Sequence, residues 1–272
     1  MTINAKNPMI MGVLNITPDS FSDGGKYLNF DVAIATAKRM VVQGADIIDV
    51  GGESTRPGAL SVSEADEIAR VIPVIKALAD QINIPISIDT SKPQVMKLAV
   101  EAGASIINDV NALQAPGALD IVAALGVDVC LMHQKGTPKT MQNNPKYADV
   151  VDEICQFFEN RIEACLQAGI AKDKLILDPG FGFGKTLAHN LEILRRFDDF
   201  KRFKLRLLAG LSRKSMIGAL LNNADAKTRV IGSVTGAIIA VQNGANIVRV
   251  HDVLETKDAL KILQVVNGDK IG

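Results

Sequence analysis

The chain has 272 residues with 30 basic and 30 acidic side chains, and it contains no Trp and only two Tyr. A net charge of zero and so few aromatic rings supply neither the basic field nor the stacking platform that nucleic-acid binding uses, so we expect no nucleic-acid partner. The three Cys form no CxxC pair, and no charged and apolar leader precedes the first apolar run. These features predict a cytoplasmic protein in a reducing compartment.

Eight short apolar runs, rich in Ile, Val and Leu, predict buried parallel strands, and none is long enough to cross a membrane. In chain order they span residues 9–16, 46–50, 85–88, 105–107, 128–132, 175–177, 205–211 and 246–250. Each is followed by a stretch of helical length and apolar spacing, at residues 31–43, 64–80, 93–102, 118–125, 147–168, 187–197, 229–243 and 255–266. This alternation predicts an α/β fold, the closed (β/α)8 or TIM barrel, and the length suits residues 1–272 forming one domain.

A polar residue stands at or just past the end of every apolar run. These residues are Asn15, Asp49, Asp89, Asn108, His133, Asp178, Ser212 and Arg249. In such barrels the carboxyl ends of the strands face the active site. For one Asp alone, a helix cap or a Lys partner is the simpler explanation. The whole set favours a polar ligand, because so many unpaired polar groups are costly to bury.

Acidic residues and one amide form a first group of candidate binding residues. Asp49, Asp89, Asn108 and Asp178 offer acceptors and an amide suited to a ring with adjacent N–H donors, such as a 2-aminopyrimidinone.

Basic residues form the second group. Arg249 and His251 flank Val250 and share one face of a strand end, where Arg and His together suit a pyrophosphate. Arg56 and Lys214 add further positive charge. Residues 212–215, SRKS, open a helix whose free N–H groups favour an anion, although Ser215 is equally well explained as a simple cap.

The glycine-rich residues 178–186, DPGFGFGKT, are not a Walker A loop, because Pro179 stands where the first glycine of that motif belongs. We interpret them as a tight turn that lets a ligand approach the backbone. There is no GxSxG elbow, which disfavours covalent catalysis. His133 and His189 receive no predicted role.

Two long segments resemble the signatures of the dihydropteroate synthase family: residues 11–25, MGVLNITPDSFSDGG, and residues 49–58, DVGGESTRPG. Shorter segments agree with the same family, in the same order: residues 87–90, 107–110, 131–133, 178–185, 212–215 and 249–252. The resemblance covers nearly the whole chain. It implies condensation of 6-hydroxymethyl-7,8-dihydropterin pyrophosphate with 4-aminobenzoate, which yields 7,8-dihydropteroate and pyrophosphate in folate synthesis.

The resemblance also implies roles at the pterin. Asp89, Asn108 and Asp178 would hold the pterin edge, Met132 would pack nearby, and Lys214 would bond the polar side of the ring.

At the pyrophosphate, the resemblance implies contacts from Arg249 and His251, with Arg249 also lying against the pterin. Thr55 and Arg56 would cover the substrates, and Thr55 would reach the pyrophosphate. Asn15 would bind a Mg²⁺ cofactor that bridges to the leaving-group oxygens.

Other residues would shape the aminobenzoate side. Phe21, Pro57, Phe183 and Ser215 would form that pocket, where sulfonamides compete in the family, and Ser215 would receive the carboxylate. Asp19 and Asp23 would order the first loop. The resemblance makes Asp23, Arg56, Lys214, Arg249 and His251 the catalytic set, and it implies a homodimer built from outer helices.

Two other functions stay open on the sequence. A methyltetrahydrofolate methyltransferase would share the barrel and the acidic pterin edge but would not need Arg249 and His251. A pterin-binding homologue without turnover would not need Asn15, Arg56, Lys214 and Arg249 together. For the synthase we predict a dissociative displacement, because an arylamine is a neutral nucleophile near pH 7 and the harder step is expelling pyrophosphate.

Overall fold

The computed structural model describes residues 7–16, 26–54, 61–137 and 140–268. Eight parallel strands close into a barrel in sequence order, β1 pairing with both β2 and β8. The strands are β1 Met9–Asn15, β2 Ile47–Gly51, β3 Ile86–Asp89, β4 Ile106–Asp109, β5 Asp128–Met132, β6 Leu175–Asp178, β7 Arg206–Ala209 and β8 Ile247–Val250. The predicted TIM barrel is confirmed.

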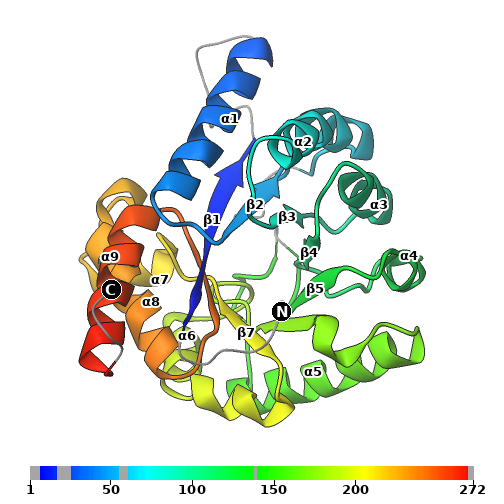
Figure 1. The fold of residues 1–272 in the computed structure, drawn as a ribbon. Helices are drawn as coiled ribbons and strands as arrows, with labels where there is room; N and C mark the ends of the chain where they lie inside the picture. Colours follow the sequence, from blue (N-terminus) through cyan, green and yellow to red (C-terminus); the bar gives the residue numbers. More distant parts are fainter. Residues whose placement is uncertain (1–6, 17–25, 55–60, 138–139, 269–272) are drawn as a thin grey trace.

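Helices surround the barrel (Figure 1). They are α1 Lys26–Val42, α2 Glu64–Ala79, α3 Pro93–Glu101, α4 Ala118–Leu125, α5 Val150–Gln167, α6 Leu187–Arg195, α7 Ser215–Leu220, α8 Val230–Gln242 and α9 Val253–Val266. Short 3-10 helices add η2 Lys172–Lys174, η3 Phe197–Phe203 and η4 Ala226–Thr228. Among the described residues no helix is long and apolar enough to cross a membrane.

Several predicted boundaries were wrong by a few residues, for local reasons. The helix expected from residue 147 begins at Val150, because the Asp149 side chain accepts from the backbone N–H groups of Val151 and Asp152, both at 2.9 Å, and caps it. Strands β3 and β6 run one residue further than expected and include Asp89 and Asp178. Both Asp residues continue the strand ladder, because in a barrel a polar side chain can point into the mouth while its backbone stays paired.

The apolar core has two parts. The larger part lies between the strands and the surrounding helices. The smaller part fills the barrel and consists of Met11, Ile47, Ile106, Cys130, Ile176, Leu208 and Ile247, one residue from each of seven strands. Because side chains alternate along a strand, the residues two positions further on also point inward, one layer higher. That higher layer holds the candidate site.

Candidate active site

The layer above the inner core is polar where the core is apolar. On five strands, the residue two positions after the inner-core residue belongs to this layer. These residues are Asp49, Asn108, Met132, Asp178 and Arg249, which follow Ile47, Ile106, Cys130, Ile176 and Ile247. The three polar strand-end residues Asp49, Asn108 and Asp178 are at most 5% exposed. The strand alternation therefore gathers residues from five separate strands at the carboxyl end of one barrel.

Arg249 lies at the centre of this layer. Its Nε atom is 2.6 Å from Oδ2 of Asp49, and its Nη2 atom is 2.7 Å from Oδ2 of Asp89. The Nδ2 atom of Asn108 donates to the same Oδ2 of Asp49 over 3.2 Å. Although burial disfavours the cation, these two carboxylates raise the pKa of Arg249 above its usual value. Four strand ends are thus joined by one charged network.

Two carboxylate oxygens in this network remain available. Oδ1 of Asp49 and Oδ1 of Asp89 are buried and have no hydrogen-bond partner among the described residues. Burial raises the pKa of Asp89 to about 7, aided by the charge of Asp49 and opposed by Arg249. Buried acceptors without donors are costly in a folded protein. Their presence indicates a ligand that brings its own N–H donors.

Two glycines lie next to the polar side chains of the mouth. A Cβ atom on Gly51 would lie 3.6 Å from Oδ1 of Asn15 and 3.7 Å from Oδ2 of Asp89. A Cβ atom on Gly210 would lie 3.8 Å from both Oδ2 of Asp178 and Cβ of Arg249. Asn15 and Asp89 therefore lie beside Gly51, and Asp178 and Arg249 lie beside Gly210.

Lys214 and Phe183 meet on the Asp178 side of the mouth. The Nζ atom of Lys214 lies 4.6 Å from the centre of the Phe183 ring and donates to the carbonyl oxygen of Phe181 over 2.5 Å. Burial lowers the pKa of Lys214 to about 8, although Asp178 opposes the shift. Oδ1 of Asp178 accepts from the backbone N of Gly180 over 2.8 Å, and burial raises the pKa of Asp178. An aromatic face and a cation thus stand beside the acceptors.

The glycine-rich turn packs tightly on the segment after β5. Gly180 has φ +69°, and a Cβ atom there would lie 2.0 Å from the carbonyl oxygen of His133, so only glycine fits. Nζ of Lys185 lies 3.0 Å from Nδ1 of His133 and donates to the carbonyls of Gly180 and Phe183 over 2.8 and 3.0 Å. Sequence reasoning missed this buried Lys–His contact, which holds the turn that carries Phe183.

His251 is oriented by Ser212, three residues after the end of β7. Its Nδ1 atom lies 3.1 Å from Oγ of Ser212, and its backbone N donates to the same oxygen over 3.2 Å. Nearby, Arg213 forms an ion pair with Asp252, with Nε 3.0 Å from Oδ2. The segments after β7 and β8 are thus fixed to each other where the sequence predicts pyrophosphate contacts.

The structure brings together most, but not all, of the predicted site. Asn15, Asp89, Asn108, Met132, Asp178, Phe183, Lys214, Arg249 and His251 lie at or beside the mouth, and Ser215 is the exposed first residue of α7. Asp19, Phe21, Asp23, Thr55, Arg56 and Pro57 lie outside the described residues. Among the described residues, no group of three His, Cys, Asp or Glu side chains could hold a metal ion. His189 caps α6, its Nδ1 accepting from the backbone N of Thr186 over 3.2 Å.

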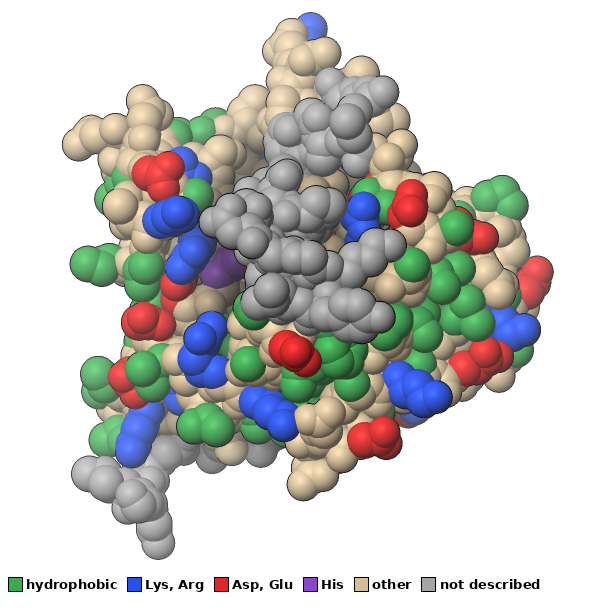
Figure 2. Space-filling view, turned by 90° about the horizontal axis from the view of Figure 1, so that it is seen from above, with side chains coloured by type: hydrophobic (Ala, Val, Ile, Leu, Met, Phe, Trp, Pro, Cys, Tyr) green, Lys and Arg blue, Asp and Glu red, His purple; other side chains and the backbone are tan. Residues whose placement is uncertain are grey.

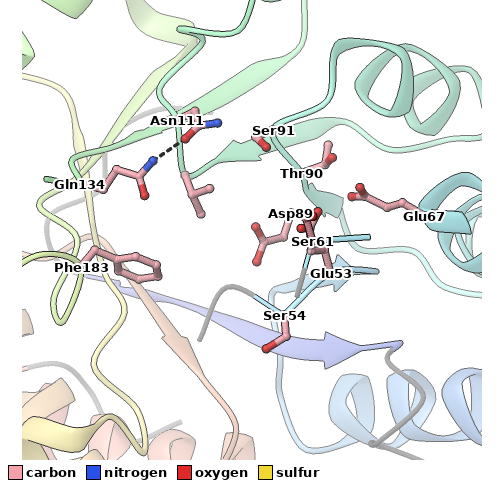
Figure 3. A pocket seen from close by; sticks show the side chains of 11 residues that line it. Glu53, Ser54, Ser61, Glu67, Asp89, Thr90, Ser91, Asn111, Gln134 and Phe183 are labelled. Carbon is pink, nitrogen blue, oxygen red and sulfur yellow. Dashed lines mark hydrogen bonds between the residues drawn. The ribbon is translucent and has the colours of Figure 1, made fainter. Parts of the chain in front are cut away.

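A cavity of about 230 Å³ opens beside Asp89. Phe183 faces it from one side, while Thr90 and Glu67 lie on the other side, and Asn111 bonds to Gln134 near its edge (Figure 3). On the face shown in Figure 2, acidic and basic side chains are interspersed, as the zero net charge suggests.

Comparison with known proteins identifies the family. The family model described as pterin binding enzyme matches residues 11–251. The dihydropteroate synthase of Escherichia coli strain K12 is 52% identical over 263 residues, covering 97% of this chain and 93% of that protein.

Solved structures agree over the whole length. The Yersinia pestis dihydropteroate synthase with a sulfonamide drug complex superposes with a TM-score of 0.94 at 52% identity, covering 99% of this chain and 98% of that one. The Xanthomonas albilineans enzyme in complex with 7,8-dihydropteroate gives a TM-score of 0.90 at 45% identity, covering 98% and 96%. The chain therefore belongs to the pterin-binding enzyme family and, within it, to the dihydropteroate synthases.

Proposed function

We propose that the barrel mouth condenses 6-hydroxymethyl-7,8-dihydropterin pyrophosphate with 4-aminobenzoate, releasing pyrophosphate and 7,8-dihydropteroate. The observation that carries the proposal is the pair of buried carboxylates, Asp49 and Asp89, bridged by Arg249 and each left with one unpartnered oxygen. The test is to mix the purified protein with both substrates and Mg²⁺ and to measure dihydropteroate. Absence of product would leave only a pterin-binding or methyl-transfer role.

In this assignment the pterin occupies the space between Asp89 and Asp178. The free acceptors would take the ring N–H donors, Asn108 would orient the edge, and Lys214 would bond the opposite polar side. Such charge-assisted hydrogen bonds in a partly dry site are stronger than neutral ones. Phe183 and Ser215 would border the aminobenzoate, where we propose that sulfonamides compete.

Arg249 and His251 would hold the pyrophosphate, together with Thr55 and Arg56. As the bond to the pterin methylene breaks, negative charge grows on the leaving group, and fixed cations stabilise that charge without reorganising. Ser212 keeps the His251 ring oriented for this contact.

The residues fit a Mg²⁺ cofactor that takes most of its ligands from substrate and water. Asn15 supplies one hard amide oxygen beside the space above Gly51, close to the Asp89 carboxylate. Mg²⁺ commonly binds proteins through one or two oxygen ligands and completes its shell with phosphates and water. When bound, it would neutralise charge on the pyrophosphate, and we expect chelation by EDTA to stop turnover.

We propose that bond breaking precedes attack by the amine. The carboxylates of Asp89 and Asp178 around the pterin would stabilise positive charge on the pterin methylene as pyrophosphate leaves. The segments after β1 and β2 would exclude water from that carbon. We therefore expect slow release of pyrophosphate in the absence of 4-aminobenzoate, measured in single-turnover experiments. Release that depends strictly on 4-aminobenzoate would rule out this route.

The pH dependence of kcat/KM for the pterin substrate should be bell-shaped. Asp89, with a pKa of about 7, must lose its proton to accept the pterin donors, so the rate rises through that pH. Lys214, with a pKa of about 8, must keep its proton to bond the ring, so the rate falls above that pH. Replacing Lys214 by Arg should move only the alkaline limb upward. Identical profiles for the two proteins would contradict the assignment.

We propose a homodimer that uses outer helices. Ile231, Thr235 and Ile239 form one exposed face of α8, with Ile231 83% exposed. Leu220 and Leu221 at the end of α7 are also exposed, and a Cβ atom on Gly232 of α8 would lie 3.0 Å from the Leu221 side chain. Sedimentation should give twice the chain mass, and Ile231→Asp should shift the equilibrium toward monomer.

A further inference from the structure

Two cross-links, one residue apart, join the segment after β7 to the segment after β8. Oγ of Ser212 lies 3.1 Å from Nδ1 of His251 and accepts from the backbone N of His251 over 3.2 Å. The next residue of each segment completes an ion pair: Nε of Arg213 lies 3.0 Å from Oδ2 of Asp252, and Nη2 of Arg213 bonds to Oδ1. A guanidinium that bonds to both oxygens of one carboxylate has a fixed orientation as well as a fixed distance. The ion pair therefore fixes the two segments relative to each other directly beside Ser212 and His251.

Asp252 is used differently from most acidic residues at its position. It is the N-cap residue of α9, yet among the described residues its side chain makes no cap hydrogen bond to that helix. An Asp at an N-cap normally accepts from the first backbone N–H groups and so stabilises the helix. Here the buried carboxylate bonds to Arg213 instead, and this bond raises the pKa of the Arg213 guanidinium. The chain thus gives up a local cap for a link between two segments.

Arg213 also holds an unfavourable backbone conformation. Its φ angle is +57°, in the left-handed region that residues with a Cβ atom seldom adopt. Its backbone N donates to Oγ of Ser233 in α8 over 2.8 Å, and Nη1 of Arg229, directly before α8, donates to its carbonyl oxygen over 2.9 Å. Strained residues that are held by several contacts cluster at functional sites. Because α8 fixes the Arg213 backbone, the ion pair passes that position on to Asp252.

The Ser212 hydroxyl can hold the His251 ring in one tautomer. Its oxygen accepts from the backbone N–H of His251, so the simplest arrangement has its own O–H donating to Nδ1 of the ring. A neutral imidazole that accepts at Nδ1 carries its proton on Nε2. An Nε2–H group is a donor suited to a phosphate oxygen. Because hydrogen bonds are short and directional, this arrangement depends on the spacing of the two segments.

We propose that Arg213 and Asp252 are positioning residues for turnover: their ion pair sets the spacing at which Ser212 holds the His251 ring with its proton on Nε2, ready to donate to the leaving pyrophosphate. They act through Ser212 and His251 rather than on a substrate. The inference rests on the proposed function, because the pyrophosphate contact of His251 belongs to that reaction. Small errors in placement are costly in catalysis, since the groups involved must lie in a narrow range of positions.

Lys214 follows Arg213 in the chain but has a separate anchor. Its Nζ atom donates to the carbonyl of Phe181 over 2.5 Å and lies 4.6 Å from the centre of the Phe183 ring, both on the turn after β6. Loss of the ion pair should therefore disturb His251 more than the pterin contact of Lys214. This difference separates a positioning role at the pyrophosphate from a general disturbance of the mouth.

The first test observes the ring itself and uses no substrate. The chain has three His residues, so ¹⁵N labelling of His allows the signal of His251 to be separated from those of His133 and His189. At about pH 8.5, where an ordinary imidazole is neutral, the ring shifts should show His251 as the Nε2–H tautomer alone. Ser212→Ala and Arg213→Met should each convert it to a mixture of tautomers and leave the other two His signals in place. A mixture in the unaltered chain, or an unchanged His251 signal in Arg213→Met, would overturn the proposal.

The second test separates positioning from stability. Asp252→Ser removes the ion pair but supplies a side chain that caps helices well, so α9 should persist. We expect kcat/KM for the pterin pyrophosphate to fall at least about 10-fold, while the Kd of 6-hydroxymethylpterin changes less than about 2-fold. Arg213→Gly accommodates the positive φ angle without strain and should show the same split. An unaltered rate in either variant, or an equal loss of 6-hydroxymethylpterin affinity, would contradict the role of the pair.

Arg196→Met is the matched control. The Arg196 side chain is 32% exposed, against 31% for Arg213, and its Nη1 atom pairs with Oδ2 of Asp149 over 2.7 Å. This pair joins the end of α6 to the start of α5 and includes no residue of the predicted site. The variant should change neither the rate nor the His251 tautomer. Absence of dihydropteroate from the unaltered chain would overturn the proposed function alone, because the tautomer measurement needs no turnover.

Discussion

Arg249→Met is expected to lower kcat by about 100- to 1,000-fold, the loss typical of removing one fixed group that stabilises transition-state charge. The guanidinium lies 2.6 Å from Asp49 and 2.7 Å from Asp89, at the mouth where the pyrophosphate would leave. Methionine keeps much of the length but supplies no charge. Steady-state kinetics with saturating 4-aminobenzoate measure the effect. A kcat within about 3-fold of the unaltered value would contradict the role given to Arg249.

The same variant should be less stable, by about 3–5 kcal/mol, because two buried carboxylates lose their common partner. The loss of stability in Arg249→Met, relative to the unaltered chain, should grow as the pH rises. The pKa of Asp89 is about 7 in the folded chain and ordinarily 3.8, so between those values the folded chain holds an extra proton and the stability from this group falls as the pH rises. Without Arg249 that pKa rises further. Urea unfolding at pH 5 and pH 8 would show the difference.

Arg206→Met is the matched control. Arg206 is 3% exposed, and its Nη1 atom pairs with Oδ2 of Asp128 over 2.7 Å. Both residues begin their strands, so the pair lies at the amino end of the barrel, away from the mouth. This variant should also lose stability, but kcat per folded molecule should stay unchanged. An equal loss of kcat in both variants would mean that Arg249 acts through folding alone.

Asp178→Asn is expected to weaken pterin binding by about 10- to 100-fold, since losing one charged hydrogen bond costs about 1.5–3 kcal/mol. The amide retains an oxygen that can accept from Gly180, so the turn after β6 should persist. Affinity for 4-aminobenzoate should change far less. Calorimetry with 6-hydroxymethylpterin and with 4-aminobenzoate measures the two effects, and equal losses would contradict the assignment of Asp178 to the pterin edge.

Asp173→Asn serves as the control for that substitution. Asp173 is exposed in η2, just before the same strand β6, so it lies at the opposite end of the barrel from Asp178. It should leave both affinities unchanged.

Much of the site follows from alternation along the strands. A short apolar strand that ends in a polar residue can be recognised locally, and barrel closure then brings all such ends to one side. Asp89, Asn108 and Asp178 were predicted in this way. Asp49 was recognised by the same pattern, and the network shows that it is as central as the others, since it accepts from both Arg249 and Asn108.

Local signals also explain where the predicted boundaries failed. The helix expected over residues 187–197 ends at Arg195, and the 3-10 helix η3 follows it, in which Phe197, Phe200 and Phe203 are buried. Their spacing of three suits a 3-10 helix, whose side chains repeat every third residue, rather than an α-helix. The ends of the helices depended on single capping contacts such as that of Asp149.

The sequence by itself determined the barrel, its polar mouth and the family, because these depend on patterns repeated within short segments. Only the tertiary structure decided which charges pair. Arg249 meets Asp49 and Asp89 from 200 and 160 positions away, and Lys92 meets Glu53 and Glu67 across 39 and 25 positions. No local period encodes such contacts, because they arise from strand register and helix packing around a closed barrel.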